Sequence, residues 1–113
     1  MDPVRLPTHI EVNALLRRVA AAGGFATVLA KGERDAGTVL VVVLGRDRDS
    51  RAFERMPQPG STRAWSVSRA QDPADPGAFE AYLDRRRTQD PDLWIVELDV
   101  RDGERFIEEF LDS

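Results

Sequence analysis

The spacing of apolar residues predicts that the chain opens with an amphipathic helix. Apolar residues between Val12 and Ala22 recur at intervals of three and four, which is the helical period. Thr8 and Glu11 match a capping box, in which the threonine hydroxyl accepts a hydrogen bond from the backbone of the glutamate. Gly23 follows as a left-handed stop. The pattern therefore predicts a helix over residues 9–22.

Four segments of alternating or β-branched residues follow this helix and are typical of strands. The segment 38–44 contains four valines and is apolar on both faces, so we expect it in the centre of a sheet. Glycine, proline and charged residues separate the segments, which favours a four-stranded antiparallel meander. The predicted strands cover residues 25–31, 38–44, 51–56 and 62–68.

A second helix and a fifth strand complete the predicted elements. Asp75-Pro76 is typical of an N-cap followed by proline at the first helical position, and we expect this helix to end near Gln89. A strand is predicted over residues 93–100. The end of the chain is ambiguous, because Asp102-Gly103 suits a hairpin turn whereas the apolar positions between Phe106 and Leu111 have helical spacing. We favour a short helix there.

These elements predict one small α+β domain. We expect a mostly antiparallel sheet of about five strands with the two main helices on one face, the other face being partly solvated or paired with a second subunit. A length of 113 residues with 42% hydrophobic residues suits a single domain. The chain has no cysteine, and neither its first residues nor its longest apolar run, 39–44, matches a signal peptide or a membrane span. We therefore expect a cytoplasmic protein without membrane insertion.

The net charge of −4 argues against binding to duplex DNA. The basic residues are nearly all arginine, however, and they form two clusters on the two main helices. If those helices packed side by side, Arg17, Arg18, Arg85 and Arg86 could form a site for an anion or a partner. Acidic residues near the second cluster favour the plainer interpretation of solvated helix faces with ion pairs inside the chain.

Four residues, His9, Asp35, Glu97 and Asp99, form a candidate polar cluster. Glu97 and Asp99 are two positions apart on a predicted strand and so share a face. A metal-dependent nuclease of the restriction-enzyme type would need a lysine where Asp99 stands, so the motif fails. We expect no metal, and the lack of a glycine-rich phosphate loop or a dinucleotide fingerprint predicts no cofactor.

Three stretches of the chain resemble one bacterial family, called domain of unknown function 1491. They are Thr8–Ile10 running into Ala14–Arg18, then Lys31-Gly32 with Asp35–Gly37, and then Arg85–Arg87 with Asp90–Glu97. The resemblance spans nearly the whole chain, and the last stretch is the most specific. It implies membership of that family but supplies no activity, substrate or catalytic residue.

The leading hypothesis is a small non-enzymatic interaction domain that binds a protein partner or itself. The alternative is a metal-dependent hydrolase or nucleic-acid-processing protein that uses the acidic strand end and the arginine clusters. An interaction domain should expose an apolar or aromatic patch. An enzyme should show a concave pocket where Asp35, Glu97 or His9 converge. Trp65 and Trp94 are both expected in the core.

Overall fold

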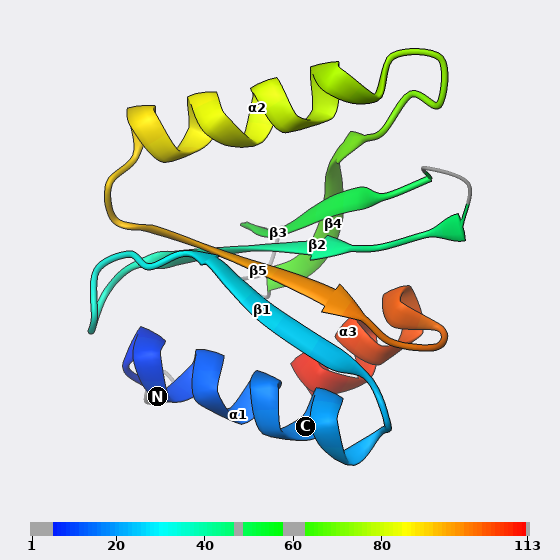
Figure 1. Cartoon of the computed structure of the whole chain (residues 1–113). Coiled ribbons are helices and arrows are strands. Elements are labelled where there is room, and N and C mark those ends of the chain that lie inside the picture. The colour runs from blue at the N-terminus through cyan, green and yellow to red at the C-terminus, as the bar shows by residue number, and fades with distance from the viewer. Residues whose placement is uncertain (1–5, 47–48, 58–62, 113) are drawn as a thin grey trace.

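Three helices surround a five-stranded sheet in the computed structural model of the chain, which describes residues 6–46, 49–57 and 63–112 (Figure 1). None of the helices within these ranges is long and apolar enough to cross a bilayer. The elements are α1 (Thr8–Ala21), β1 (Phe25–Ala30), β2 (Thr38–Val43), β3 (Arg51–Pro57), β4 (Arg63–Ala70), α2 (Pro76–Gln89), β5 (Leu93–Asp99) and α3 (Gly103–Asp112).

The strands lie in the order β1-β5-β2-β3-β4. β5 runs antiparallel to β1 and parallel to β2, while the other pairings are antiparallel. The predicted α+β class, mostly antiparallel sheet and central position of β2 are therefore confirmed. The predicted meander in chain order is wrong at one point, because β5 lies between β1 and β2. β2 and β5 are the most deeply buried strands, because each has a strand on either side and side chains from helices over both faces.

The helices cover both faces of the sheet, so the prediction of two main helices on one face is wrong. α1 and α3 lie below the sheet in Figure 1 and α2 lies above it. Val12 and Ile107 pack with Val96 in one core cluster, whereas Phe79 packs with Ile95 in the other. The physical reason is that β2 and β5 are apolar on both sides, and each side must be removed from water.

The predicted capping box at the start of α1 is also wrong. Thr8 is the first helical residue, follows Pro7, and forms no side-chain cap. Its hydroxyl instead donates to the backbone carbonyls of Gly37 at 3.0 Å and Asp35 at 3.3 Å. The Thr8 hydroxyl is therefore hydrogen-bonded to the loop before β2 and does not cap the helix. The predicted stop is confirmed, because Gly23 adopts a left-handed φ of 83°.

Candidate functional site

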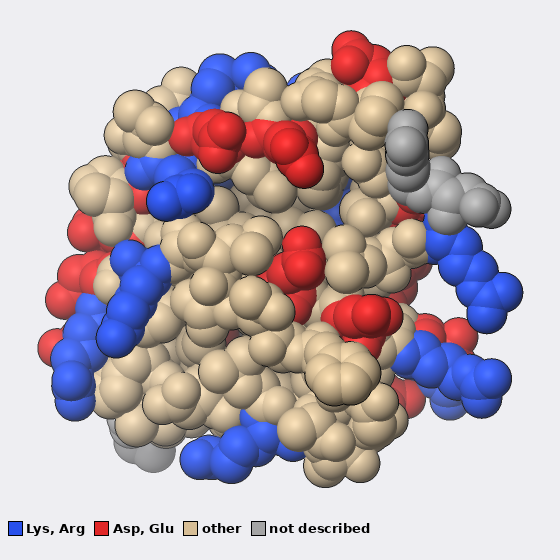
Figure 2. All heavy atoms as spheres, viewed as in Figure 1, with Lys and Arg blue, Asp and Glu red and all other residues tan. Residues whose placement is uncertain are grey.

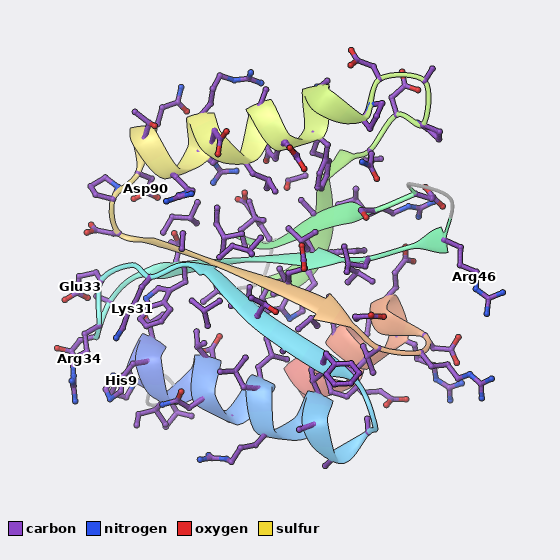
Figure 3. The ribbon with its side chains drawn as sticks, viewed as in Figure 1. His9, Lys31, Glu33, Arg34, Arg46 and Asp90 are labelled. Carbon is purple, nitrogen blue, oxygen red and sulfur yellow. The ribbon has the colours of Figure 1, made fainter. Side chains whose placement is uncertain are left out.

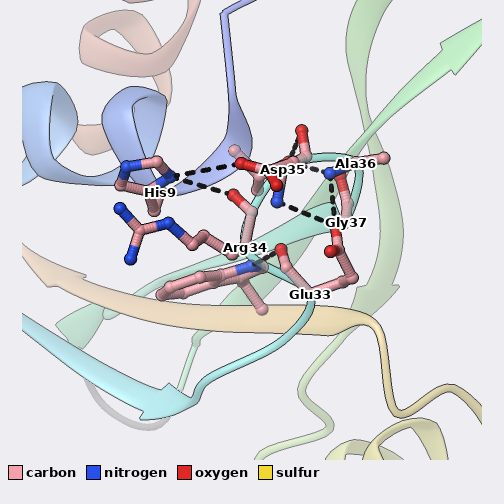
Figure 4. A network of polar contacts seen from close by, with 8 residues as sticks. His9, Glu33, Arg34, Asp35, Ala36 and Gly37 are labelled. Atoms are coloured by element: carbon pink, nitrogen blue, oxygen red, sulfur yellow. Dashed lines mark hydrogen bonds and ion pairs between the residues drawn. The ribbon is translucent and has the colours of Figure 1, made fainter.

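A hydrogen-bond network joins the start of α1 to the loop between β1 and β2 (Figure 4). The Glu33 carboxylate accepts from the backbone N–H groups of Ala36 and, at 2.8 Å, of Asp35. These two N–H groups, that of Ala36 above all, hold the pKa of the Glu33 carboxyl below its ordinary value of 4.5. The backbone carbonyl of Glu33 accepts from the indole of Trp94 at 2.7 Å. The loop is therefore fixed both by its own backbone and by the core.

His9 and Asp35, two residues of the predicted polar cluster, meet in this network. His9 Nδ1 lies 4.0 Å from Asp35 Oδ1 and 3.1 Å from the carbonyl oxygen of Arg34. Figure 3 shows His9, Lys31 and Arg34 at the same end of the molecule. The Asp35 side chain is mostly exposed. These contacts attach the start of α1 to the loop between β1 and β2, and neither His9 nor Asp35 is a fully buried acid or base.

Glu97 and Asp99 lie on the face of β5 that is directed toward α2. They share a face, as predicted, and stand opposite Thr27 and Phe25 of β1. Leu98, which lies between them along β5, points to the opposite face, into the core cluster that includes α1. The four candidate residues therefore divide into two separate pairs. Across the described ranges, no group of three side chains is placed to hold a metal ion.

The two arginine clusters do not share a surface, because α1 and α2 cover opposite faces of the sheet. Arg17 and Arg18 belong to α1, and Arg86 belongs to α2. Arg86 pairs with Glu54 and donates to the Tyr82 hydroxyl at 2.9 Å. The hydrogen bond to Glu54 is the main reason that the pKa of Arg86 is raised. Arg86 thus joins α2 to β3 rather than forming an anion site with α1.

A hollow of about 1060 Å³ lies where β2 and β5 end and α3 begins. Its lining includes Arg51, whose guanidinium lies 2.9 Å from Glu104 and 3.9 Å from Asp49. The charge of Arg51 is therefore compensated within the chain. None of the residues His9, Asp35 and Glu97 lines this hollow.

The clearest exposed apolar surface is the free edge formed by β1. This strand ends the sheet, and four of its six residues are exposed. Phe25 is 75% exposed and Leu29 is 37% exposed. Residues 25–30 carry no charge and no proline, which are the usual protections of a sheet edge. A bulge beside Leu29 is the one such protection that β1 has.

The opposite edge, β4, differs in chemistry. It carries arginine and serine among its residues, including Arg69 and Ser68. The Ser68 hydroxyl donates to the carbonyl of Ala52 and accepts a hydrogen bond from the Tyr82 hydroxyl. Arg69 lies over the Tyr82 ring at 5.4 Å. β4 is therefore protected by polar side chains that are tied to α2, whereas β1 is not.

A groove of about 370 Å³ adjoins β1 on the side of α2. Leu29 and Leu44 contribute apolar lining, and three acidic residues, Glu80 and Asp84 from α2 and Glu97 from β5, contribute charge. Figure 2 shows acidic side chains over α2 and over the strands below it, among uncharged atoms. We call residues 25–30 together with this groove the β1 surface. The sequence interpretation missed Glu80 and Asp84 as parts of a site.

These observations define a three-layer α+β domain with one open, uncharged sheet edge. The model of the family described as a protein of unknown function (DUF1491) matches residues 6–108, so the chain belongs to this family and the predicted resemblance is confirmed. No curated protein matches the chain.

Solved structures of the same family resemble the fold closely. A crystal structure at 1.87 Å of a family member from Caulobacter crescentus is 39% identical, with a TM-score of 0.76 over 90% of this chain and 94% of that one. An NMR structure of a family member from Caulobacter crescentus is 37% identical, with a TM-score of 0.72 over 93% and 94%. A solution structure of an A. tumefaciens protein is 32% identical, with a TM-score of 0.67 over 88% and 89%.

Proposed function

We propose that the chain is a small cytoplasmic interaction domain that binds a protein partner by adding an extended segment of that partner to β1. The uncharged, exposed edge of β1 carries this proposal. The outer backbone groups of an edge strand are available to pair with another chain. In recognition by strand addition, main-chain hydrogen bonds supply affinity and neighbouring pockets select side chains. The groove beside Leu29 is placed to act as such a pocket.

A second copy of the chain is the other occupant that an open edge admits. Antiparallel pairing of two β1 strands would form one continuous sheet with both α2 helices on the same side. The acidic side chains of the two grooves would then lie on the same face, where like charges repel. A different protein is therefore the better-supported partner.

The enzymatic alternative lacks support from the geometry. The polar candidates do not converge in a pocket, since His9 and Asp35 lie away from the groove that Glu97 lines. The absence of duplex DNA binding stays a prediction.

Selection from a random peptide display library would test the proposed function without assuming any partner. The protein would be immobilised and bound peptides enriched, and their sites mapped by protection of backbone amides from hydrogen exchange. We expect the enriched peptides to protect the amides of residues 25–30. They should bind Leu29→Lys more weakly, because a charge on an edge strand opposes pairing.

Val67→Lys is the matched control, since Val67 is an exposed apolar residue on the other edge strand. Peptides should bind this variant as they bind the wild type. Protection that falls outside β1, or equal loss of binding in both variants, would refute strand addition. If the protein self-associates and Leu29→Lys abolishes this, the partner that binds β1 is a second copy of the chain and not a different protein.

A further inference from the structure

We infer that the segment added to β1 is basic, with lysine or arginine alternating with apolar residues. This inference rests on the proposed function and specifies the chemistry of the partner. It follows from the charges beside the edge and from the lack of ion pairs to their side chains among the described residues.

The charged lining of the groove is predominantly acidic. Glu80, Asp84 and Glu97 outnumber Arg87, the one basic residue among the described lining residues. Asp99 adds a further carboxylate on the same face of β5 as Glu97. Figure 2 shows the acidic groups among uncharged surface, with arginine and lysine mainly toward the margins of the view. A cation on a partner would therefore meet an attractive field here.

The acidic groups are also available. Within the described part of the chain, the side chains of Glu80, Asp84 and Glu97 have no ion pair or hydrogen bond. By contrast, Glu54 is paired with Arg86 and Glu104 with Arg51. Carboxylates that lack an ion-pair partner gain from a cation supplied by another molecule.

The spacing of the strands suits a long basic side chain. Neighbouring strands lie about 4.8 Å apart, so a strand added to β1 lies about 10 Å from β5. Thr27 stands opposite Glu97 on the same face of the sheet. Because the Thr27 side chain is small, it does not block a long side chain that crosses β1 toward Glu97. A lysine or arginine can lay its methylene stem over Thr27 and Leu29 and bring its charged end to the groove. A short side chain, or an acidic one, cannot satisfy these carboxylates.

Alternation follows from the geometry of a strand. Successive side chains of the added segment point to opposite faces of the sheet. On the α2 face they meet Glu97 and Asp99, whereas on the other face they continue from Ala26 and Val28, which stand beside the core residues Leu98 and Val96. Basic residues suit the first face and apolar residues the second.

Two synthetic peptides test this inference on the intact chain. One eight-residue peptide alternates valine with lysine, and the other has glutamate in place of each lysine. We expect the lysine peptide to bind at least about ten-fold more tightly in a fluorescence anisotropy titration. Its affinity should fall as salt rises, since the exposed charges are screened. Glu97→Gln and Asp84→Asn should each weaken it about two- to five-fold.

Glu109→Gln removes the same charge from α3, on the other side of the sheet, and should leave the affinity unchanged. Equal binding of the two peptides, or binding of neither, would overturn the basic-partner inference. If display selection still yields peptides that protect β1 while the lysine peptide shows no preference, the proposed function survives and only the charge assignment fails. If selection yields none, both fail.

Discussion

The indole N–H of Trp94 donates a 2.7 Å hydrogen bond to the backbone carbonyl of Glu33, which ties the second residue of β5 to the loop before β2. The ring is 4% exposed and belongs to the core cluster beneath α1. The predicted burial of this tryptophan is confirmed. One side chain thus fills the core and also holds the loop that receives the helix start.

Replacement of Trp94 separates these two contributions. Trp94→Ala should lower the free energy of unfolding by about 3–5 kcal/mol, because it leaves a cavity in the core. Trp94→Phe keeps most of the ring but leaves the Glu33 carbonyl without its donor, so we expect a loss of about 1–3 kcal/mol. Equilibrium urea unfolding measures both. A wild-type urea midpoint and slope for Trp94→Ala would contradict the burial.

The role of the Thr8 hydroxyl can be tested by exchanging a donor for an acceptor. A capping threonine should tolerate aspartate, which is a good N-cap residue. In this structure the hydroxyl donates to two carbonyls and the residue is 2% exposed, so a carboxylate would face oxygen atoms instead. We expect Thr8→Ser to retain most of the stability and Thr8→Asp to lose at least about 1 kcal/mol. Equal thermal midpoints of the two variants would show that the side chain accepts hydrogen bonds.

Gly32 should not tolerate even one added methyl group. A Cβ at this position would collide with the backbone carbonyl of Asp92. We expect Gly32→Ala to destabilise the fold by about 1–3 kcal/mol, as overpacking usually does. Gly77→Ala is the matched control, because its nearest neighbour, Asp75 Oδ1, is 4.0 Å away and alanine favours a helix. Chemical denaturation should show opposite signs, and equal midpoints would refute the close approach.

Stability should depend on acid through Glu33. Its pKa is lowered in the folded protein, so the unfolded chain binds the proton more readily. The resulting stabilisation is fully present above the ordinary value of 4.5 and is lost as the pH falls through the lowered folded value. Between pH ~5 and ~3, the thermal midpoint of the wild type should therefore fall more steeply than that of Glu33→Gln. Parallel curves in scanning calorimetry would exclude this linkage.

Local signals in the sequence were sufficient for the elements of the fold. The left-handed stop at Gly23, the helix start at Asp75-Pro76 and the C-terminal helix are present as predicted, although Asp75 forms no side-chain cap hydrogen bond. Each depends on residues within a turn or two, where backbone preferences act directly. Burial of β2 on both faces was readable from its uninterrupted run of apolar residues.

The arrangement of these elements was not readable in the same way. The pairing of β1 with β5 joins residues about seventy positions apart, and no turn signal encodes it. The capping box failed because carbonyls of Asp35 and Gly37 compete for Thr8, which a local motif cannot reveal. The β1 surface had one visible signal, an uncharged segment before Lys31, whose meaning depended on its place at a sheet edge.

The central position of β5 also determines when the sheet can assemble on a ribosome. β1 needs β5 as its neighbour, and β5 begins 63 residues after β1 ends. At the usual rate of about 5–20 residues per second, synthesis of that interval takes about 3–13 s. Throughout this time a nascent β1 has neither of its edges paired, although its residues are uncharged and mostly apolar. For several seconds, the emerging chain therefore exposes to molecular chaperones an apolar strand whose neighbour in the sheet has not yet been synthesised.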